Sequence, residues 1–219
     1  MSSDLAKERL YKAIGRVAGA LASAGRLQIL EFVAQGERSV EALAAMTGLS
    51  VANTSKHLQA LRQAGLVSAR KQGLHVYYSI AGDDVSALLA SLRDVAEHRA
   101  ADVDRLLRDW LAHRDVLEPV PARELLERAK KGLVTVLDVR PEEEYAAGHL
   151  PGAINVPVEK LEGLLSRLPK RKEVVAYCRG PYCLMSFEAV KTLRKRGFKA
   201  KRLENGYPEW RAAGLPVER

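Results

Sequence analysis

Two cysteines, Cys178 and Cys183, carry the most reactive chemistry of the sequence. They are the only cysteines among 219 residues and lie five positions apart. A disulfide-rich secreted protein distributes its cysteines to link distant segments, which this spacing does not do. A thiolate is a nucleophile and a ligand for thiophilic metals. The pair therefore predicts a reactive thiol site rather than a structural cross-link.

The elements around the pair favour the thiolate form. Strands and helices alternate in the pattern from Ala122 onward, which predicts a parallel sheet with helices on both faces. The predicted strand Glu173–Tyr177 ends directly before Cys178, at the edge where such sheets bind ligands. Backbone N–H groups of the next loop and the positive end of a helix from Leu184 to Arg196 would stabilise an anion there. We therefore expect Cys178 to be the reactive group.

Three segments of this half resemble the rhodanese family. They are residues 137–157 (LDVRPEEEYAAGHLPGAINVP), 177–183 (YCRGPYC) and 203–210 (LENGYPEW). The resemblance implies that Cys178 takes sulfane sulfur from a small donor such as thiosulfate, holds it as a persulfide and passes it to an acceptor. The implied active loop consists of Cys178, Arg179, Gly180, Pro181, Tyr182 and Cys183. Asp138, Arg140 and His149 are expected to support the loop and sheet rather than to react.

The roles of two loop residues stay open. Arg179 either attracts an anionic donor or faces solvent. Cys183 either resolves a Cys178 persulfide as a disulfide or polysulfide, or is a small residue at the start of a helix. Phosphatase and arsenate-reductase relatives of the fold use a Cys-x5-Arg loop, whereas the sixth position after Cys178 is Leu184. The loop length therefore favours sulfur over phosphate or arsenate.

The first half of the chain carries an uninterrupted basic window. The formal net charge is +8 and the pI is about 9.6. A total charge of this size also suits an ordinary solvated surface. Its distribution is more specific, because no Asp or Glu occurs between Ala42 and Gly82 while four Lys and Arg residues do. Such a window is typical of a surface that faces nucleic-acid phosphates.

The same window has the pattern of two helices, a tight turn and a hairpin. We predict helices over Val40–Met46 and Val51–Gln63, then strands over Leu66–Arg70 and His75–Ile80. Asn53 and Thr54 would reach bases and Ser55, Lys56 and Arg62 would reach phosphates, while Val51, Leu58 and Leu61 would face the core. The alternative to DNA binding is a helix whose polar face is only solvated, with His57 packed on the scaffold. The full predicted DNA-binding set is Ser50, Asn53, Thr54, Ser55, Lys56, His57, Gln59, Arg62, Arg70, Lys71 and Gln72.

Residues 49–67 (LSVANTSKHLQALRQAGLV) and the hairpin through Tyr78 resemble the ArsR/SmtB family of regulators. The resemblance implies a dimer that binds operator DNA and is released by an inducer. Family members often sense metals through cysteines on the helix before the recognition helix, and residues 39–43 contain none. A second family site uses Asp and His on the last helix, where solvated faces carry the same residue types. Its candidates are Asp94, Glu97, His98, Asp102, Asp104 and His113, and we predict no metal and no cofactor.

Two domains are therefore expected. Residues 1–113 would form a mainly α winged helix-turn-helix domain with a small β-hairpin wing, 114–121 a linker and 122–219 an α/β rhodanese-like parallel sheet. A single helix from Asp84 to His113 is predicted to pack against a second subunit, so we expect a homodimer. No apolar run is long enough to span a bilayer and the first residues do not resemble a secretory signal. We therefore expect no membrane partner and a cytoplasmic location.

Three functions remain open from the sequence. The first is a DNA-binding repressor that responds to reactive sulfur at Cys178, because the DNA-binding half has no cysteine of its own. The second is a working sulfurtransferase joined to a DNA-binding domain. The third is a regulator in which Cys178 and Cys183 bind a thiophilic metal or arsenite, although two thiols supply too few ligands for a closed site.

Overall fold

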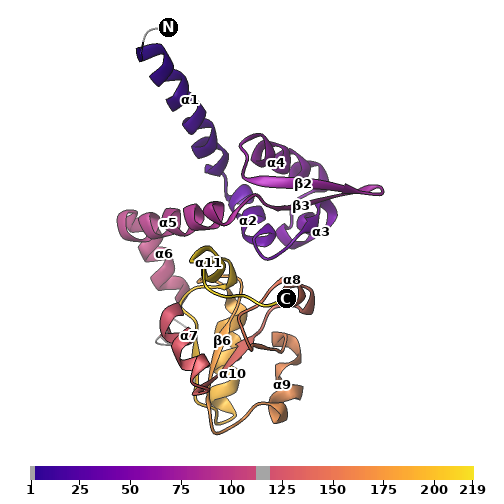
Figure 1. The fold of residues 1–219 in the computed structure, drawn as a ribbon, viewed down its shortest axis with the longest axis vertical. Coiled ribbons are helices and arrows are strands. Elements are labelled where there is room, and N and C mark those ends of the chain that lie inside the picture. Colours follow the sequence, from indigo (N-terminus) through magenta and orange to yellow (C-terminus); the bar gives the residue numbers. More distant parts are fainter. Residues whose placement is uncertain (1–2, 112–118) are drawn as a thin grey trace. The chain divides into compact units, whose positions relative to one another are not determined.

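The computed structural model describes residues 3–111 and 119–219. The chain divides into two compact units, Met1–Val85 and Ser86–Arg219 (Figure 1). The predicted linker over 114–121 lies largely outside the described residues, so the domain boundaries remain a prediction. No helix among the described residues is long and apolar enough to cross a membrane.

The first unit is a helical domain with a three-stranded antiparallel sheet in the order β1-β3-β2. Its turn between helices is fixed by capping: Ser39 Oγ accepts from Ala42 N, Gly48 ends one helix with φ 70°, and Ser50 Oγ accepts from Asn53 N. The predicted helix, turn, helix and hairpin are confirmed. The elements are α1 (Ser3–Leu21), α2 (Ala24–Val33), β1 (Arg38–Ser39), α3 (Val40–Thr47), α4 (Val51–Gln63), β2 (Val67–Gln72) and β3 (His75–Ile80).

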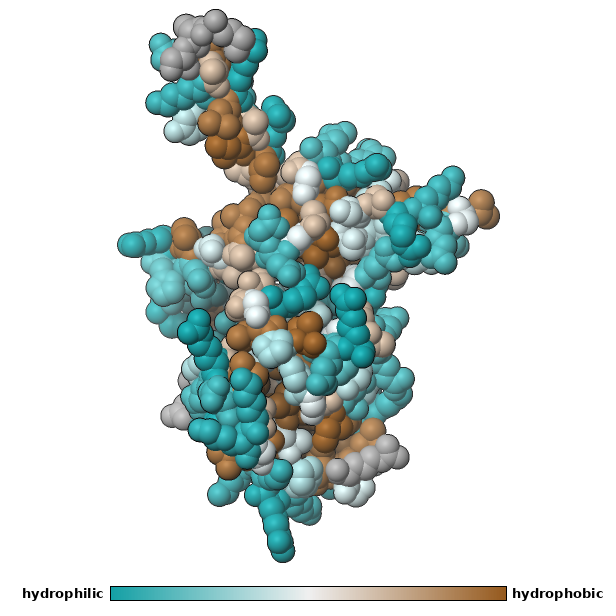
Figure 2. Space-filling model, viewed as in Figure 1, coloured by the Kyte–Doolittle hydropathy of each residue, from teal (hydrophilic) through white to brown (hydrophobic). Residues whose placement is uncertain are grey.

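Apolar residues of α2, α3 and α4 form the core of this unit. Leu58 and Leu61 are fully buried, as predicted. The prediction that Val51 faces the core is wrong, because its side chain is 50% exposed at the first position of α4. Helix α1 extends away from the other helices of the unit, and hydrophobic side chains lie along it (Figures 1 and 2). Leu10 and Ile14 on α1 are 59% and 54% exposed.

Two helices stand where one was predicted. Helix α5 (Asp83–Arg99) and helix α6 (Ala101–Leu111) are separated at Ala100. Neither Gly nor Pro stands at the break, and the charges on either side of it suit two helix ends. His98 and Arg99 lie in the last turn of α5, where the helix dipole favours cations, and Asp102 and Asp104 lie in the first turn of α6, where it favours anions. The part of the predicted helix beyond residue 111 lies outside the described residues.

A four-stranded parallel sheet in the order β5-β4-β6-β7 forms the rest of the second unit, which confirms the predicted α/β class. Residues 158–167 form three short helical pieces rather than one continuous helix. The elements are α7 (Ala122–Lys130), β4 (Val134–Asp138), α8 (Glu142–Ala147), β5 (Ile154–Asn155), η1 (Val158–Lys160), α9 (Leu161–Leu164), η2 (Leu165–Arg167), β6 (Glu173–Tyr177), α10 (Leu184–Lys195), β7 (Ala200–Arg202) and α11 (Tyr207–Ala212).

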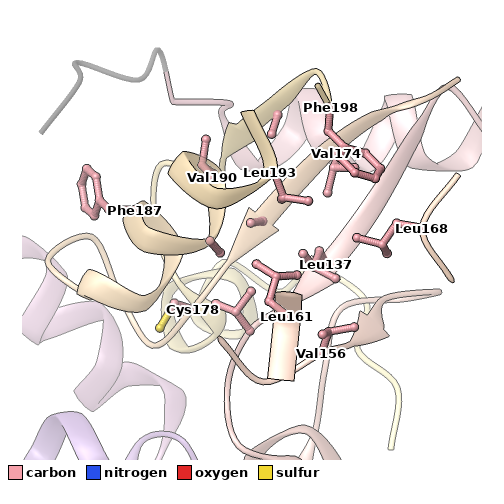
Figure 3. Packing of buried hydrophobic residues seen from close by; sticks show 14 residues of the cluster. Leu137, Val156, Leu161, Leu168, Val174, Cys178, Phe187, Val190, Leu193 and Phe198 are labelled. Atoms are coloured by element: carbon pink, nitrogen blue, oxygen red, sulfur yellow. The ribbon is translucent and has the colours of Figure 1, made fainter. Parts of the chain in front are cut away.

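Each face of this sheet carries its own apolar layer, because side chains alternate along the strands. On one face Leu137 and Val174 pack with Val190 and Leu193 of α10 (Figure 3). Residues of α7 and α11, including Leu125 and Trp210, pack in the other layer. Burial of each large aliphatic side chain contributes roughly 1.5–3 kcal/mol. The sheet therefore gives a rigid frame at whose strand ends a reactive loop can be held.

Candidate functional site

Cys178 lies directly after the carboxyl end of β6. Its side chain is 1% exposed and belongs to the apolar layer under α10. Its carbonyl oxygen accepts a hydrogen bond of 3.1 Å from Tyr207 N, which fixes the backbone of Cys178 to the start of α11. The nucleophile predicted from the sequence therefore stands on the sheet frame at the expected edge.

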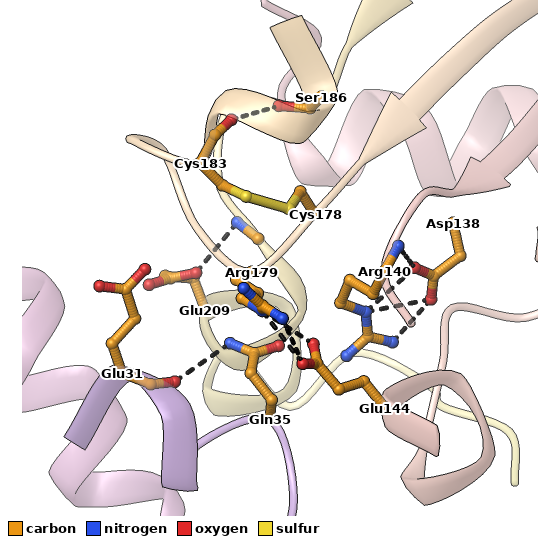
Figure 4. Close-up of a disulfide and its surroundings, with 11 residues drawn as sticks. Glu31, Gln35, Asp138, Arg140, Glu144, Cys178, Arg179, Cys183, Ser186 and Glu209 are labelled. Carbon is orange, nitrogen blue, oxygen red and sulfur yellow. Dashed lines mark hydrogen bonds and ion pairs between the residues drawn. A yellow bond between two sulfur atoms is a disulfide. The ribbon is translucent and has the colours of Figure 1, made fainter. Parts of the chain in front are cut away.

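A disulfide joins Cys178 to Cys183, with 6.2 Å between their Cα atoms (Figure 4). Cys183 is the residue that precedes the first turn of α10, and its N–H donates to Gly180 O at 3.2 Å. Ser186 Oγ donates to Cys183 O at 3.0 Å. The two sulfur atoms thus lie at bonding distance within one loop.

Gly206 makes room for this loop. A Cβ atom at Gly206 would lie 2.4 Å from Gly180 N and 2.4 Å from Arg179 C. The loop backbone therefore passes directly over Gly206, and any side chain there would push the loop away from the sheet. Glu209 Oε2 accepts from Gly206 N at 2.9 Å and holds this crossing at the start of α11.

Arg179 is neither turned to solvent nor available as a lone positive charge. Its Nε and Nη2 donate to both carboxylate oxygens of Glu144, with Nη2 2.7 Å from Oε1 (Figure 4). Glu144 on α8 is fully buried and the Arg179 side chain is 18% exposed. Glu144 was not predicted as a site residue, because a run of three Glu residues is typical of a solvated helix start.

Asp138 and Arg140 form a buried ion pair beneath the site. Arg140 Nη2 lies 2.6 Å from Asp138 Oδ2 and 2.7 Å from Gly148 O, and both charged side chains are fully buried. Burial alone would lower the pKa of Arg140, but Asp138 more than offsets this, so the pKa lies above its ordinary value. The Tyr177 hydroxyl donates to Asp138, and burial raises the pKa of Tyr177 well above its ordinary value. The pair fixes the end of β4 and the segment after α8.

His149 is also held by structural contacts. Its Nδ1 lies 3.0 Å from Tyr145 O, and its ring stacks on the Tyr145 ring at 3.7 Å. Its backbone N donates to Glu218 O at 2.9 Å. These contacts occupy His149 in joining the segment after α8 to the C-terminal residues.

The predicted DNA-reading helix α4 presents most of its expected residues to solvent. Asn53, Lys56, Gln59 and Arg62 are exposed. The expected outward orientation of Thr54 is wrong, because its side chain is fully buried and its Oγ1 donates to Ser50 O at 3.0 Å. A Thr hydroxyl can form its hydrogen bond within its own helix, so the residue type alone does not indicate whether Thr54 is buried or exposed.

Two further residues of α4 are half-buried, and one cap is exposed. Ser55 and His57 are half-buried, whereas Ser50 is exposed at the N-terminus of the helix. A Cβ atom at Gly25 would lie 3.2 Å from His57 Nε2, so His57 packs near α2. His57 therefore contacts the scaffold, as expected in the alternative in which α4 is an ordinary solvated helix.

The wing is not as free of acidic neighbours as the sequence window suggests. Arg70 on β2 forms two hydrogen bonds with Glu37, one of 3.1 Å from Nε to Oε1. This contact lowers the pKa of Glu37. Glu41 lies 3.8 Å from His75 Nδ1. Lys71 and Gln72 are exposed. Glu37 and Glu41, which lie just before the acid-free window in the sequence, therefore contact the wing in the folded structure.

The candidate metal ligands on α5 and α6 are not grouped into a cluster within the described part of this chain. Among residues 3–111 and 119–219, no three His, Cys, Asp or Glu side chains are grouped so as to hold a metal ion. His113 lies outside the described residues.

Comparisons with known proteins agree with both units. Residues 23–69 match the arsR family of bacterial regulatory proteins, and residues 121–213 match the rhodanese-like domain. The HTH-type transcriptional regulator Rv0324 of Mycobacterium tuberculosis is 48% identical over 212 residues, which cover 97% of this chain and 93% of that protein. The chain belongs to the ArsR family of transcriptional regulators. This ArsR-family regulator carries a rhodanese-like domain in its second half.

Two partial relatives match one half each of the ArsR-family regulator. The homodimeric winged helix-turn-helix DNA-binding domain Mb0332 of Mycobacterium bovis is 45% identical, with coverage of 47% of this chain and 93% of that chain and a TM-score of 0.42. A sulfurtransferase of Allochromatium vinosum is 32% identical over 85 residues, which cover 38% of this chain and 78% of that protein.

Proposed function

We propose that this regulator is a dimeric repressor that responds to reactive sulfur through Cys178 and Cys183. The observation that carries the proposal is the disulfide geometry of the two thiols in one six-residue loop at the end of β6. Both cysteines of the chain stand in that loop, so the DNA-binding unit has no thiol with which to sense sulfur itself. Redox-sensing cysteines often have a resolving cysteine nearby.

The proposed chemistry has two steps. The Cys178 thiolate attacks the terminal sulfur of a sulfane donor; with thiosulfate, the S–S bond breaks, sulfite leaves and Cys178 becomes a persulfide. The Cys183 thiolate then attacks Cys178 Sγ, and the terminal sulfur leaves as hydrosulfide. Two thiols are oxidised to a disulfide and one sulfane sulfur is reduced to sulfide, so no further oxidant is required.

A homodimer would cover the apolar side chains that this chain leaves exposed on its long helices. Leu88, Leu92 and Val95 of α5 are 42%, 39% and 60% exposed. Contiguous exposed apolar surface of this kind is typical of subunit interfaces. The dimer would present two α4 helices to half-sites about one DNA turn apart. Because such a repressor binds double-stranded operator DNA, we expect it to act in the cytoplasm.

The test is operator binding by the full-length protein, fully reduced and then treated with polysulfide. We expect treated wild-type protein to lose operator affinity and Cys178→Ser to be unresponsive. Mass spectrometry should find a disulfide in the wild type and, in Cys183→Ser, a persulfide with the added mass of one sulfur atom on Cys178. Equal operator affinity before and after treatment, with sulfur loaded on Cys178, would contradict the sensing role.

A second candidate function is a working sulfurtransferase. The similarity of residues in this half to the Allochromatium vinosum sulfurtransferase favours it. Steady transfer of thiosulfate sulfur to an acceptor thiol, lost in Cys178→Ala, would support an enzyme. A single loading event per chain without turnover would support a sensor.

The thiophilic-metal or arsenite alternative makes a different prediction. Titration with the metal should block both thiols at one equivalent of metal per loop or per dimer.

A further inference from the structure

The active loop has a contact with a helix about eighty residues earlier in the chain. Within the second unit, the hydroxyl of Tyr182, the residue before Cys183, donates to the carboxylate of Glu97 on α5. Burial and this hydrogen bond raise the pKa of Tyr182 above its ordinary value, so the phenol stays protonated and able to donate at neutral pH. The contact joins the loop directly to α5.

A second contact joins α5 to the segment beneath the loop. Arg93 pairs with Glu209 of α11, and these side chains are 25% and 10% exposed. Glu209 also accepts from Gly206 N, and the peptide between Arg179 and Gly180 passes over Gly206. Arg93 and Glu97 are one turn apart on α5 and therefore lie on the same face. One face of α5 thus contacts both the loop and its support.

The opposite face of α5 carries the exposed apolar residues. Leu88, Leu92 and Val95 follow each other at helical spacing, about half a turn of the helix wheel away from Arg93 and Glu97. These are the side chains that a second subunit would cover. Helix α5 is therefore placed to contact the sulfur loop on one side and the partner subunit on the other.

A change in the chemical state of the thiols would act on Tyr182 through the adjacent Cys183. Cys178 is fixed, because it is buried at the end of β6 and its carbonyl is bound by Tyr207 N. A persulfide extends Cys178 by one S–S bond, about 2 Å, into space that Cys183 Sγ occupies in the disulfide. On the other side of the loop, the N–H of Cys183 donates to Gly180 O and its carbonyl accepts from Ser186 Oγ, so a displacement of Cys183 moves the loop together with the start of α10. Tyr182 moves with Cys183 because they are adjacent.

From these contacts we infer that α5 is part of the sulfur site: Glu97, through Tyr182, positions the Cys183 side of the loop and transmits the thiol state to α5. Arg93 acts in the same way through Glu209. The inference deepens the proposed function and rests on it for the use of the signal in DNA release. The coupling itself requires neither sulfur nor DNA. A coupling free energy is reciprocal: if the thiol state shifts the arrangement of α5, the arrangement of α5 shifts the dithiol–disulfide equilibrium by the same free energy.

The experiment compares backbone amide hydrogen exchange of α5 in the full-length protein, reduced with a dithiol and oxidised to the Cys178–Cys183 disulfide. We expect exchange rates over Asp83–Arg99 to differ by about fivefold or more between the two forms. Tyr182→Phe and Glu97→Ala should each remove most of that difference, and the double variant should remove no more than either alone. The matched control is Ser91→Ala, an exposed position on α5 whose hydroxyl donates within the helix, to Ala87 O.

The midpoint of the dithiol–disulfide equilibrium against glutathione supplies a second readout, which a merely structural role of Glu97 would leave unchanged. We expect it to shift in Tyr182→Phe and Glu97→Ala and to stay at the wild-type value in Ser91→Ala. Equal exchange of α5 in both thiol states of the wild type would overturn the inference. If hydrogen exchange of α5 differs between the two thiol states but operator affinity does not, the coupling is supported and the proposed regulation is contradicted.

Discussion

Glu144 neutralises Arg179, the one arginine of the thiol loop, through a two-point contact between a fully buried carboxylate and a partly buried guanidinium. The positive charge expected at the mouth of the site is therefore compensated before any donor arrives. Anion attraction at this loop has to come from backbone N–H groups and the N-terminal end of α10. The contact also ties the loop to α8.

Replacement of Glu144 by Gln should separate these two effects. The variant keeps the size of the side chain but leaves Arg179 without its counter-charge, so we expect faster loading of Cys178 by thiosulfate, most clearly at low salt. Loss of the buried partner should lower the free energy of unfolding by roughly 3 kcal/mol. Stopped-flow loading rates and urea titration measure the two quantities. Glu188→Gln, an exposed position on α10, is the control; equal loading rates in both variants would show that Arg179 does not steer the donor.

Alkaline pH should destabilise the protein through Tyr177. Its folded-state pKa is raised above the unfolded value, chiefly by burial. The folded state therefore keeps a proton that the unfolded state releases, so this contribution is complete below about pH 10 and is lost as pH rises toward the higher folded pKa. Urea titrations from pH 9 upward should show a steeper fall of unfolding free energy in the wild type than in Tyr177→Phe. The exposed Tyr11→Phe should retain the wild-type slope.

Replacements on α4 should distinguish a base-reading residue from a buried one. Asn53→Ala is expected to cost about 1–3 kcal/mol of operator affinity and to relax sequence preference at one position. Thr54→Val should leave DNA specificity unchanged, because Thr54 is buried and its hydroxyl is bound to Ser50 O. Lys56→Ala should weaken binding to all sequences equally and lower the salt slope by about one. Binding curves at several salt concentrations on operator and mutated operator measure all three; a loss of specificity in Thr54→Val would contradict the buried role.

The sequence was sufficient wherever a local pattern determined the structure. The helices on either side of the tight turn, the strand that ends before Cys178 and the parallel class of the sheet all follow from short-range signals. What it could not supply are contacts between distant segments. Glu144 with Arg179, Glu97 with Tyr182 and Glu37 with Arg70 each join residues more than thirty positions apart. An acidic residue on a helix has the same local pattern whether it is solvated or bound to a cation.

Glu37 offers the clearest case in which such a distant contact limits function. Its carboxylate binds Arg70 on the wing, the first strand of the hairpin expected to face DNA. In Glu37→Gln the Arg70 guanidinium loses its counter-charge and becomes available to a phosphate, so we expect tighter binding to any DNA sequence and a salt slope steeper by about one. Arg70→Ala should give the opposite change, and the double variant should resemble Arg70→Ala because the effect of Glu37 acts through Arg70. Affinity measured against salt concentration on operator and random DNA decides the matter: if Glu37→Gln binds DNA no more tightly than wild type, the wing arginine does not reach the phosphates.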